Sequence, residues 1–223
     1  IRESRLLIVG AGGLGSPAAL YLASAGVGKI ILADGDTVDL TNLQRQILHG
    51  QSSLGLAKAL SGQTALARIN PEVAVVPITE RLAGQQLEAL VADVDAVLDC
   101  CDNFDTRHAV NRACVAYRVP LISGAAIRFS GQVAVFDARR ADSPCYHCLF
   151  PEGEDAEEMR CAVTGVFAPL TGIIGATQAA EALKLISGAG QSLAGRLLLL
   201  DALNMEWRSV RYGKDPHCAV CAG

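Results

Sequence analysis

Residues 5–16 read Arg-Leu-Leu-Ile-Val-Gly-Ala-Gly-Gly-Leu-Gly-Ser, an apolar run followed at once by closely spaced glycines. The glycines are Gly10, Gly12, Gly13 and Gly15. Glycine lets the backbone turn sharply and approach a phosphate, whose charge then meets the N-terminus of the following helix. The stretch therefore predicts a strand, a turn and a helix that bind a nucleotide or dinucleotide; a tight turn without a ligand is the alternative.

Apolar runs of strand length recur along the first half of the chain, and helical patterns fill the gaps between them. The predicted strands are Arg5–Val9, Lys29–Ala33, Val73–Ile78, Asp95–Cys100 and Pro120–Ser123. The predicted helices are Ser16–Ala25, Ser53–Ile69, Gly84–Ala92 and Asp105–Tyr117. This alternation predicts an α/β fold with a Rossmann-like, doubly wound and mainly parallel sheet, covered by helices on both faces.

The pattern changes after Gly124. Antiparallel strands are predicted at Gln132–Asp137, Arg196–Asp201 and Met205–Tyr212, with a helix at Thr171–Ile186. We interpret residues 1–223 as a single domain, with a nucleotide-binding half at 1–124 and a half at 125–223 that extends the same sheet. The acidic segment Pro151–Arg160 is predicted to be a mobile surface loop.

Composition narrows the class of protein. With 51% hydrophobic and 19% charged residues the chain is globular, and a net charge of −4 gives no basic surface for nucleic acid. The uncharged stretch Ala162–Ala180 contains Gly, Thr and Pro, which favours a buried helix over a membrane span.

No signal sequence opens the chain, so we expect a cytoplasmic protein. Because residue 1 is Ile and a strand follows closely, we expect a further segment before it.

A dense polar run, Asp34 to Gln46, follows the second predicted strand. Asp34 stands where the Gly-rich fingerprint expects an acid on the ribose hydroxyls; a solvated strand-end carboxylate is the alternative. Arg45 and Lys58 are the cations placed to meet phosphate, with Asn42 and Gln44 as neutral hydrogen-bonding groups. Taken singly, each cation is more often found on a solvated helix face.

Asp102 and Asn103 lie just beyond the fourth predicted strand, at the carboxyl edge where open α/β sheets bind ligands. A carboxylate at this edge can hold a Mg²⁺ ion that bridges phosphates. The competing interpretation is that Asp102 caps the helix predicted from Asp105.

Four of the eight cysteines form two pairs of matching spacing, Cys145-Tyr-His-Cys148 and Cys218-Ala-Val-Cys221. Four thiolates are the ligand set of a closed tetrahedral zinc site, whereas a redox dithiol would need only one pair. We interpret His147 as a bystander rather than a ligand. Cys161, which follows Arg160, is either a reactive thiolate or a small buried residue.

Together these residues resemble the ubiquitin-activating-enzyme-like superfamily, in particular the bacterial adenylyltransferases of the ThiF/MoeB/HesA group. The resemblance runs through the whole chain. Its motifs are Gly10–Gly15, Asp34–Gln46, Arg68-Ile-Asn-Pro71, Leu98–Asn103, Ser123-Gly-Ala-Ala-Ile-Arg128, both Cys pairs and Ala168-Pro-Leu-x-Gly172.

The resemblance implies a reaction in which ATP adenylylates the C-terminal Gly-Gly carboxylate of a ubiquitin-like sulfur carrier protein and releases pyrophosphate. It implies that the paired cysteines hold Zn²⁺, that Arg45, Lys58 and Mg²⁺ on Asp102 stabilise phosphate charge, and that Cys161 matches a cysteine of thioester or persulfide chemistry. The residues implied to contact ATP and Mg²⁺ are Gly13, Asp34, Thr41, Asn42, Leu43, Gln44, Arg45, Lys58, Asp102 and Asn103.

The resemblance also implies partners. These are the carrier itself, a second copy of the chain in a homodimer, and a sulfurtransferase or cysteine desulfurase. In relatives, an arginine from the N-terminal segment of one subunit reaches the partner's ATP. Ser123–Arg128 is more similar to the molybdopterin-synthase branch, whereas Cys148-Leu-Phe-Pro-Glu and Met205-Glu-Trp-Arg are more similar to the thiazole branch.

Two other functions compete with this interpretation. An NAD-dependent oxidoreductase shares the Gly-rich turn and Asp34, but gives no account of Arg45, Lys58 or the paired cysteines. A non-catalytic, zinc-bound module that docks carriers is the second alternative, and the presence of Arg45, Lys58 and Asp102 argues against it.

Overall fold

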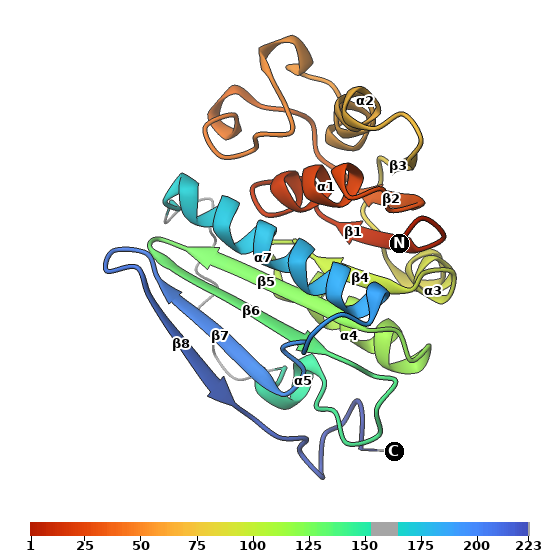
Figure 1. Cartoon of the computed structure of the whole chain (residues 1–223), viewed down its shortest axis with the longest axis vertical. Coiled ribbons are helices and arrows are strands. Elements are labelled where there is room, and N and C mark those ends of the chain that lie inside the picture. Colours follow the sequence, from red (N-terminus) through yellow and green to blue (C-terminus); the bar gives the residue numbers. More distant parts are fainter. Residues whose placement is uncertain (153–164, 223) are drawn as a thin grey trace.

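The computed structural model describes residues 1–152 and 165–222, which form one eight-stranded sheet with helices packed on both faces (Figure 1). The strand order is β3-β2-β1-β4-β5-β6-β7-β8. The strands are β1 (Arg5–Val9), β2 (Lys29–Ala33), β3 (Ala74–Ile78), β4 (Ala96–Asp99), β5 (Leu121–Ile127), β6 (Ser130–Phe136), β7 (Arg196–Asp201) and β8 (Glu206–Arg211). Pairing is parallel from β3 to β5 and antiparallel from β5 to β8.

Two hydrophobic cores lie on opposite faces of this sheet. Leu6 and Ile8 of β1 face one core, and Leu7 and Val9 face the other, as alternating side chains of a doubly covered strand do. The first core contains side chains of α1, α2 and α7, and Figure 1 shows α7 lying across β5 and β6. The second contains side chains of α3, α4 and α5. The helices are α1 (Gly15–Ser24), α2 (Lys58–Ile69), α3 (Gly84–Ala92), α4 (Phe104–Ala116), α5 (Tyr146–Leu149) and α7 (Ala168–Ser187).

The predicted α/β class, with a mainly parallel sheet extended by antiparallel strands, is confirmed. The bounds of β1, β2 and β7 are those predicted from the sequence. The predicted strand at Pro120–Ser123 is longer, because β5 stays paired with β6 as far as Ile127.

The prediction of a helix over Ser53–Ile69 is wrong at its start, since α2 begins at Lys58. Residues Gln51–Ser53 form the short 3₁₀ helix η2, and Gly55 has a φ of +79°, which a right-handed helix does not accommodate. Two further short elements, the 3₁₀ helix η1 (Leu40–Asn42) and the one-turn helix α5, were not predicted from the sequence. Most of the segment predicted to be a mobile loop, Pro151–Arg160, lies outside the described residues, and so does Cys161.

The Gly-rich turn between β1 and α1 is pressed against the end of β4. Gly10 has a φ of +100°, and a Cβ atom added there would lie 2.6 Å from the carbonyl oxygen of Cys100. A Cβ atom at Gly15 would lie 1.8 Å from the carbonyl oxygen of Gly10. Both positions therefore require glycine, and the turn keeps its backbone open toward the carboxyl edge of the sheet.

In the described part of the chain, no helix is both long enough and apolar enough to cross a bilayer. Residues 168–180 of the uncharged stretch belong instead to α7, which begins at Ala168 with Pro169 in its first turn. Ile174 and Ala179 of this helix are buried in the first core, as the prediction of a buried helix requires.

Candidate functional site

A cleft of about 1290 Å³ opens at the carboxyl edge of the parallel strands. Several predicted nucleotide-binding residues line one region of it. These are Gly10, Gly12, Gly13, Asp34, Arg45, Lys58, Asp102 and Asn103. The cleft extends to β5, β6 and the segment around α5, where Ala125, Gln132 and Phe150 line it. Gly15, Thr41, Asn42, Leu43 and Gln44 do not line it.

Asp34 fixes the Gly-rich turn in place. One oxygen of its carboxylate accepts a hydrogen bond from the Ala11 N–H at 2.7 Å, and the other accepts from the Asp36 N–H at 2.9 Å. Each carboxylate oxygen has a further lone pair, so these bonds leave Asp34 able to accept from a ribose hydroxyl. The acid therefore joins the end of β2 to the turn after β1.

His49 also supports this turn, although no motif in the sequence indicated such a role. Its Nε2 lies 2.9 Å from the Ala11 carbonyl oxygen and its Nδ1 lies 2.9 Å from the Ser61 hydroxyl of α2. Burial lowers the pKa of His49, so the ring is neutral at pH 7. Because the Ala11 carbonyl oxygen can only accept, Nε2–H donates to it and Nδ1 accepts from the Ser61 hydroxyl.

The two predicted phosphate-binding cations are held by neighbouring side chains. Lys58, the first residue of α2, is buried, and its ammonium lies 3.2 Å from the exposed carboxylate of Asp36. Arg45 donates a hydrogen bond from Nη2 to Asn42 Oδ1 at 2.9 Å. Arg45 therefore lines the cleft, whereas Asn42 does not line it and instead holds the Arg45 guanidinium in position.

Asp102 and Asn103 have different roles at the start of α4. Asn103 caps the helix, because its Oδ1 accepts the Thr106 N–H at 2.9 Å. Asp102 is exposed at the cleft and makes no hydrogen bond or ion pair with any other described residue. The capping role considered for Asp102 thus belongs to its neighbour, and the Asp102 carboxylate is available to a ligand.

A buried polar network lies beneath this edge. Arg107 of α4 forms an ion pair with Asp99 at 3.1 Å, and Ser123 donates a hydrogen bond to the same Asp99 oxygen at 2.8 Å. Arg107 also donates to the carbonyl oxygens of Cys101 and Gly124, at 2.7 and 2.9 Å. The guanidinium thereby joins the carboxyl end of β4 to the middle of β5, close in sequence to Asp102.

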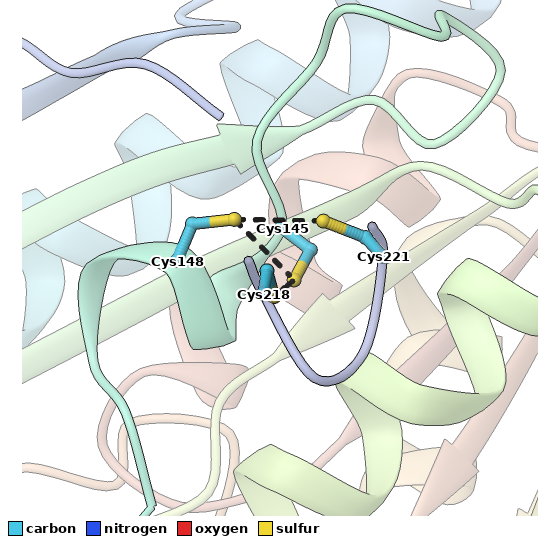
Figure 2. A group of neighbouring side chains, drawn as sticks. All are labelled: Cys145, Cys148, Cys218 and Cys221. Atoms are coloured by element: carbon cyan, nitrogen blue, oxygen red, sulfur yellow. Dashed lines mark hydrogen bonds between the residues drawn. The ribbon is translucent and has the colours of Figure 1, made fainter. Parts of the chain in front are cut away.

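The two Cys pairs meet on the second face of the sheet (Figure 2). The sulfur atoms of Cys145 and Cys148, at α5, point toward those of Cys218 and Cys221 in the segment after β8. The sulfur–sulfur distances are 4.0 Å for Cys145–Cys148, 3.7 Å for Cys145–Cys218 and 3.5 Å for Cys148–Cys221. Zn–S bonds of about 2.3 Å in a tetrahedron place sulfur atoms ~3.8 Å apart, so this donor set fits zinc.

Asn111 of α4 supports this cluster. Its Nδ2 donates to Cys145 Sγ at 3.6 Å, while its Oδ1 accepts the Tyr146 N–H at 2.9 Å. Burial raises the pKa of the Cys145 thiol to about 11, so a cation is needed to hold it as a thiolate at pH 7. The same helix therefore contacts the cysteine cluster through Asn111 and begins at the cleft with Asn103.

Three other cysteines, Cys100, Cys101 and Cys114, are free thiols whose pKa values are raised mainly by burial. Protonated, buried thiols of this kind are poor nucleophiles. None of the three therefore offers an activated thiolate at the cleft.

Comparison with known proteins identifies the family. The chain matches the ThiF family over residues 1–220. It is 47% identical to the molybdopterin-synthase adenylyltransferase of Escherichia coli (strain K12), covering 99% of this chain and 88% of that protein. It is 44% identical to the sulfur carrier protein ThiS adenylyltransferase of the same organism, covering 99% and 87%.

Solved structures agree in fold. The crystal structure of E. coli MccB with ATP superposes with a TM-score of 0.86 at 24% identity, over all of this chain and 68% of that one. Because the family match and both relatives extend over nearly the full chain, the chain belongs to the ThiF family.

Proposed function

We infer that this chain is an adenylyltransferase that activates the C-terminal carboxylate of a ubiquitin-like sulfur carrier protein with ATP. One observation supports this above others: a single cleft gathers the Gly-rich turn, two cations and the carboxylate of Asp102, which has no partner among the described residues. A nicotinamide site would use the turn and Asp34 but has no need of the remaining groups. The relatives named for this activity, at 47% and 44% identity, favour the same conclusion.

In the proposed reaction an oxygen of the carrier's terminal carboxylate attacks the α-phosphorus of ATP. The bond from the α-phosphorus to the bridging oxygen breaks, and pyrophosphate leaves with that bond's electron pair. The product is a mixed anhydride between the carrier and AMP. The carboxylate is already deprotonated at neutral pH, so the enzyme needs no general base and acts by positioning and charge stabilisation.

Each residue at the cleft has a proposed part in that reaction. Asp34 accepts hydrogen bonds from the ribose, and the N–H groups of the turn around Gly13 approach the phosphates. Arg45 and Lys58 lie on the cleft wall and stabilise negative charge on the phosphates. Asp102 would hold Mg²⁺, which when bound neutralises phosphate charge.

We propose the molybdopterin-synthase carrier as the preferred substrate and the thiazole-synthesis carrier as the second candidate. The motif Ser123–Arg128 supports the first, and Cys148-Leu-Phe-Pro-Glu supports the second. Ala125 and Ala126 of the first motif and Phe150 of the second line the same cleft, which supports a part for both motifs in contacting a carrier tail.

We also propose that Cys161 takes part in sulfur transfer from a sulfurtransferase or cysteine desulfurase.

We propose further that the chain acts as a homodimer. Large apolar side chains are exposed on the η1–α2 segment, as a dimer interface would require. They are Leu40, Ile47, Leu54, Leu56 and Leu60.

The function is tested by exchange of labelled pyrophosphate into ATP. We expect exchange only when Mg²⁺ and a carrier ending in Gly-Gly are both present, because the reverse reaction requires the acyl-adenylate. A carrier truncated by its last two residues is the matched control and should give no exchange. Tight binding of reduced nicotinamide dinucleotide together with no exchange for either carrier would instead support the oxidoreductase alternative.

We propose that the four paired cysteines hold one structural Zn²⁺. Metal analysis is expected to find about one zinc per chain, and Cys218→Ser should lose most of it because a tetrahedral site then lacks a ligand. Cys114→Ser removes a buried thiol outside the cluster and should keep the full zinc content. Unchanged zinc in Cys218→Ser, or metal-free protein in which one pair oxidises reversibly, would contradict the zinc assignment.

A further inference from the structure

A second group of metal-binding side chains lies beside the cysteine cluster. His108 of α4, His147 of α5 and Glu152 offer one ligand atom each, and these atoms lie within 4.8 Å of one another. His108 Nδ1 is 3.5 Å from Glu152 Oε1, and the two imidazole rings are 5.8 Å apart between centroids. His147 stands between Cys145 and Cys148 in the sequence but belongs to a different set of ligands.

The two imidazoles have buried nitrogen atoms with no hydrogen bond. Nδ1 of His108 and Nδ1 of His147 are both inaccessible to solvent and without a hydrogen-bond partner in residues 1–152 and 165–222. Buried polar atoms are nearly always paired, so two neighbouring exceptions call for an explanation. Packing of His108 against the Tyr146 ring accounts for the position of the ring but pairs neither nitrogen.

We propose that His108, His147 and Glu152 bind a divalent transition metal ion of the Zn²⁺ class, at a site separate from the four cysteines. Two imidazoles and one carboxylate form the ligand set of zinc sites that keep a fourth position open. Nitrogen and oxygen ligands about 2.0–2.1 Å from a tetrahedral ion lie roughly 3.4 Å apart. The distance between His108 Nδ1 and Glu152 Oε1 already matches this value.

The open position of this site faces the cleft. His108 and Glu152 both line the cleft, whereas His147 does not. A water molecule, a carboxylate or a thiolate within the cleft can therefore occupy the fourth position.

Arg112 competes with the metal for Glu152. It lies one helical turn from His108 on α4, and its guanidinium forms an ion pair with the same Glu152 oxygen. An incoming cation must displace Arg112 and is repelled by its charge. The proposal therefore predicts that Arg112→Gln tightens metal binding, whereas simple packing of the histidines predicts no effect.

The test is a titration with Co²⁺ of protein that carries one zinc per chain, with the four cysteines occupied and the second group of ligands free, without ATP or carrier, followed by visible absorption and calorimetry. We expect one equivalent of Co²⁺ beyond the zinc already bound, without the intense thiolate-to-cobalt absorption of a cysteine site. His147→Ala and Glu152→Gln should each weaken binding by at least about tenfold, since loss of even an outer-shell partner costs that much. His217→Ala is the matched control, because His217 also precedes a zinc-pair cysteine but is exposed and outside the cluster.

Two results would overturn the proposal. One is the absence of a further Co²⁺ equivalent in the wild-type protein. The other is equal Co²⁺ affinity in wild type and Glu152→Gln. The Glu152 variant decides the matter even if His147→Ala disturbs the neighbouring cysteines, because its half-exposed side chain lies outside both Cys pairs. Since the readout is metal binding alone, its outcome is independent of the proposed adenylylation.

Discussion

Asp102→Asn is expected to lower carrier-dependent pyrophosphate exchange by about 100- to 1000-fold, the loss typical for removal of one group that stabilises transition-state charge. Asn has nearly the same shape but no negative charge, so it holds Mg²⁺ poorly. Asp102 is exposed and has no partner among the described residues, so the substitution should leave the unfolding free energy almost unchanged. Exchange rates at saturating ATP, compared with urea unfolding curves, measure the two effects separately.

Asp105→Asn is the matched control for this substitution. Asp105 is also an exposed carboxylate that lines the cleft, in the first turn of the same helix. We expect its exchange rate to stay within a few-fold of wild type. Full exchange in Asp102→Asn, or an equal loss in both variants, would show that the Asp102 carboxylate has no specific part in the reaction.

Arg107→Met is expected to lower the free energy of unfolding by about 3–5 kcal/mol, because it leaves the buried Asp99 carboxylate without its charge partner. The side chains of Arg107 and Asp99 are 7% and 1% exposed, so solvent cannot replace the lost interaction. The substitution also removes the donors to the carbonyl oxygens of Cys101 and Gly124. Urea unfolding followed by circular dichroism measures the loss.

Two further variants separate the buried pair from a general effect of removing arginine. Arg140→Met removes one partner of an exposed ion pair with Asp142 and should change stability little. Asp99→Leu combined with Arg107→Met removes both buried charges and should recover part of the stability that Arg107→Met loses. If Arg107→Met unfolds at the same urea concentration as wild type, the network does not support the sheet edge as described.

Local signals allowed much of the fold to be predicted. The apolar runs of β1 and β2 and the glycines between β1 and α1 act over a few residues, so sequence alone located them. The predicted start of α2, at Ser53, was wrong. Leu54 and Leu56 were read as part of the apolar pattern of the helix, but both side chains are exposed. The positive φ of Gly55 is incompatible with a right-handed helix, so α2 begins only after this residue.

The candidate site was predictable where residue type alone indicates the chemistry. Asp34, Arg45, Lys58 and Asp102 line one cleft, and the four paired cysteines meet. The supporting residues were not predictable, because their partners are distant in sequence. Gln178 of α7, for example, donates to the carbonyl oxygens of Asp99 and Ile122. A glutamine buried in this way cannot be told from a solvated one before the strands are placed.

The most direct test of adenylylation is mass spectrometry of the carrier after mixing with this protein, ATP and Mg²⁺ in the presence of pyrophosphatase. The carrier is expected to gain the mass of one adenylyl group at its C-terminal glycine, and Asp102→Asn is expected to add almost none. Supplying the molybdopterin-synthase and thiazole carriers together would show which one is modified first. An unmodified C-terminus on both carriers, from a folded protein that binds ATP, would show that this protein does not adenylylate either carrier.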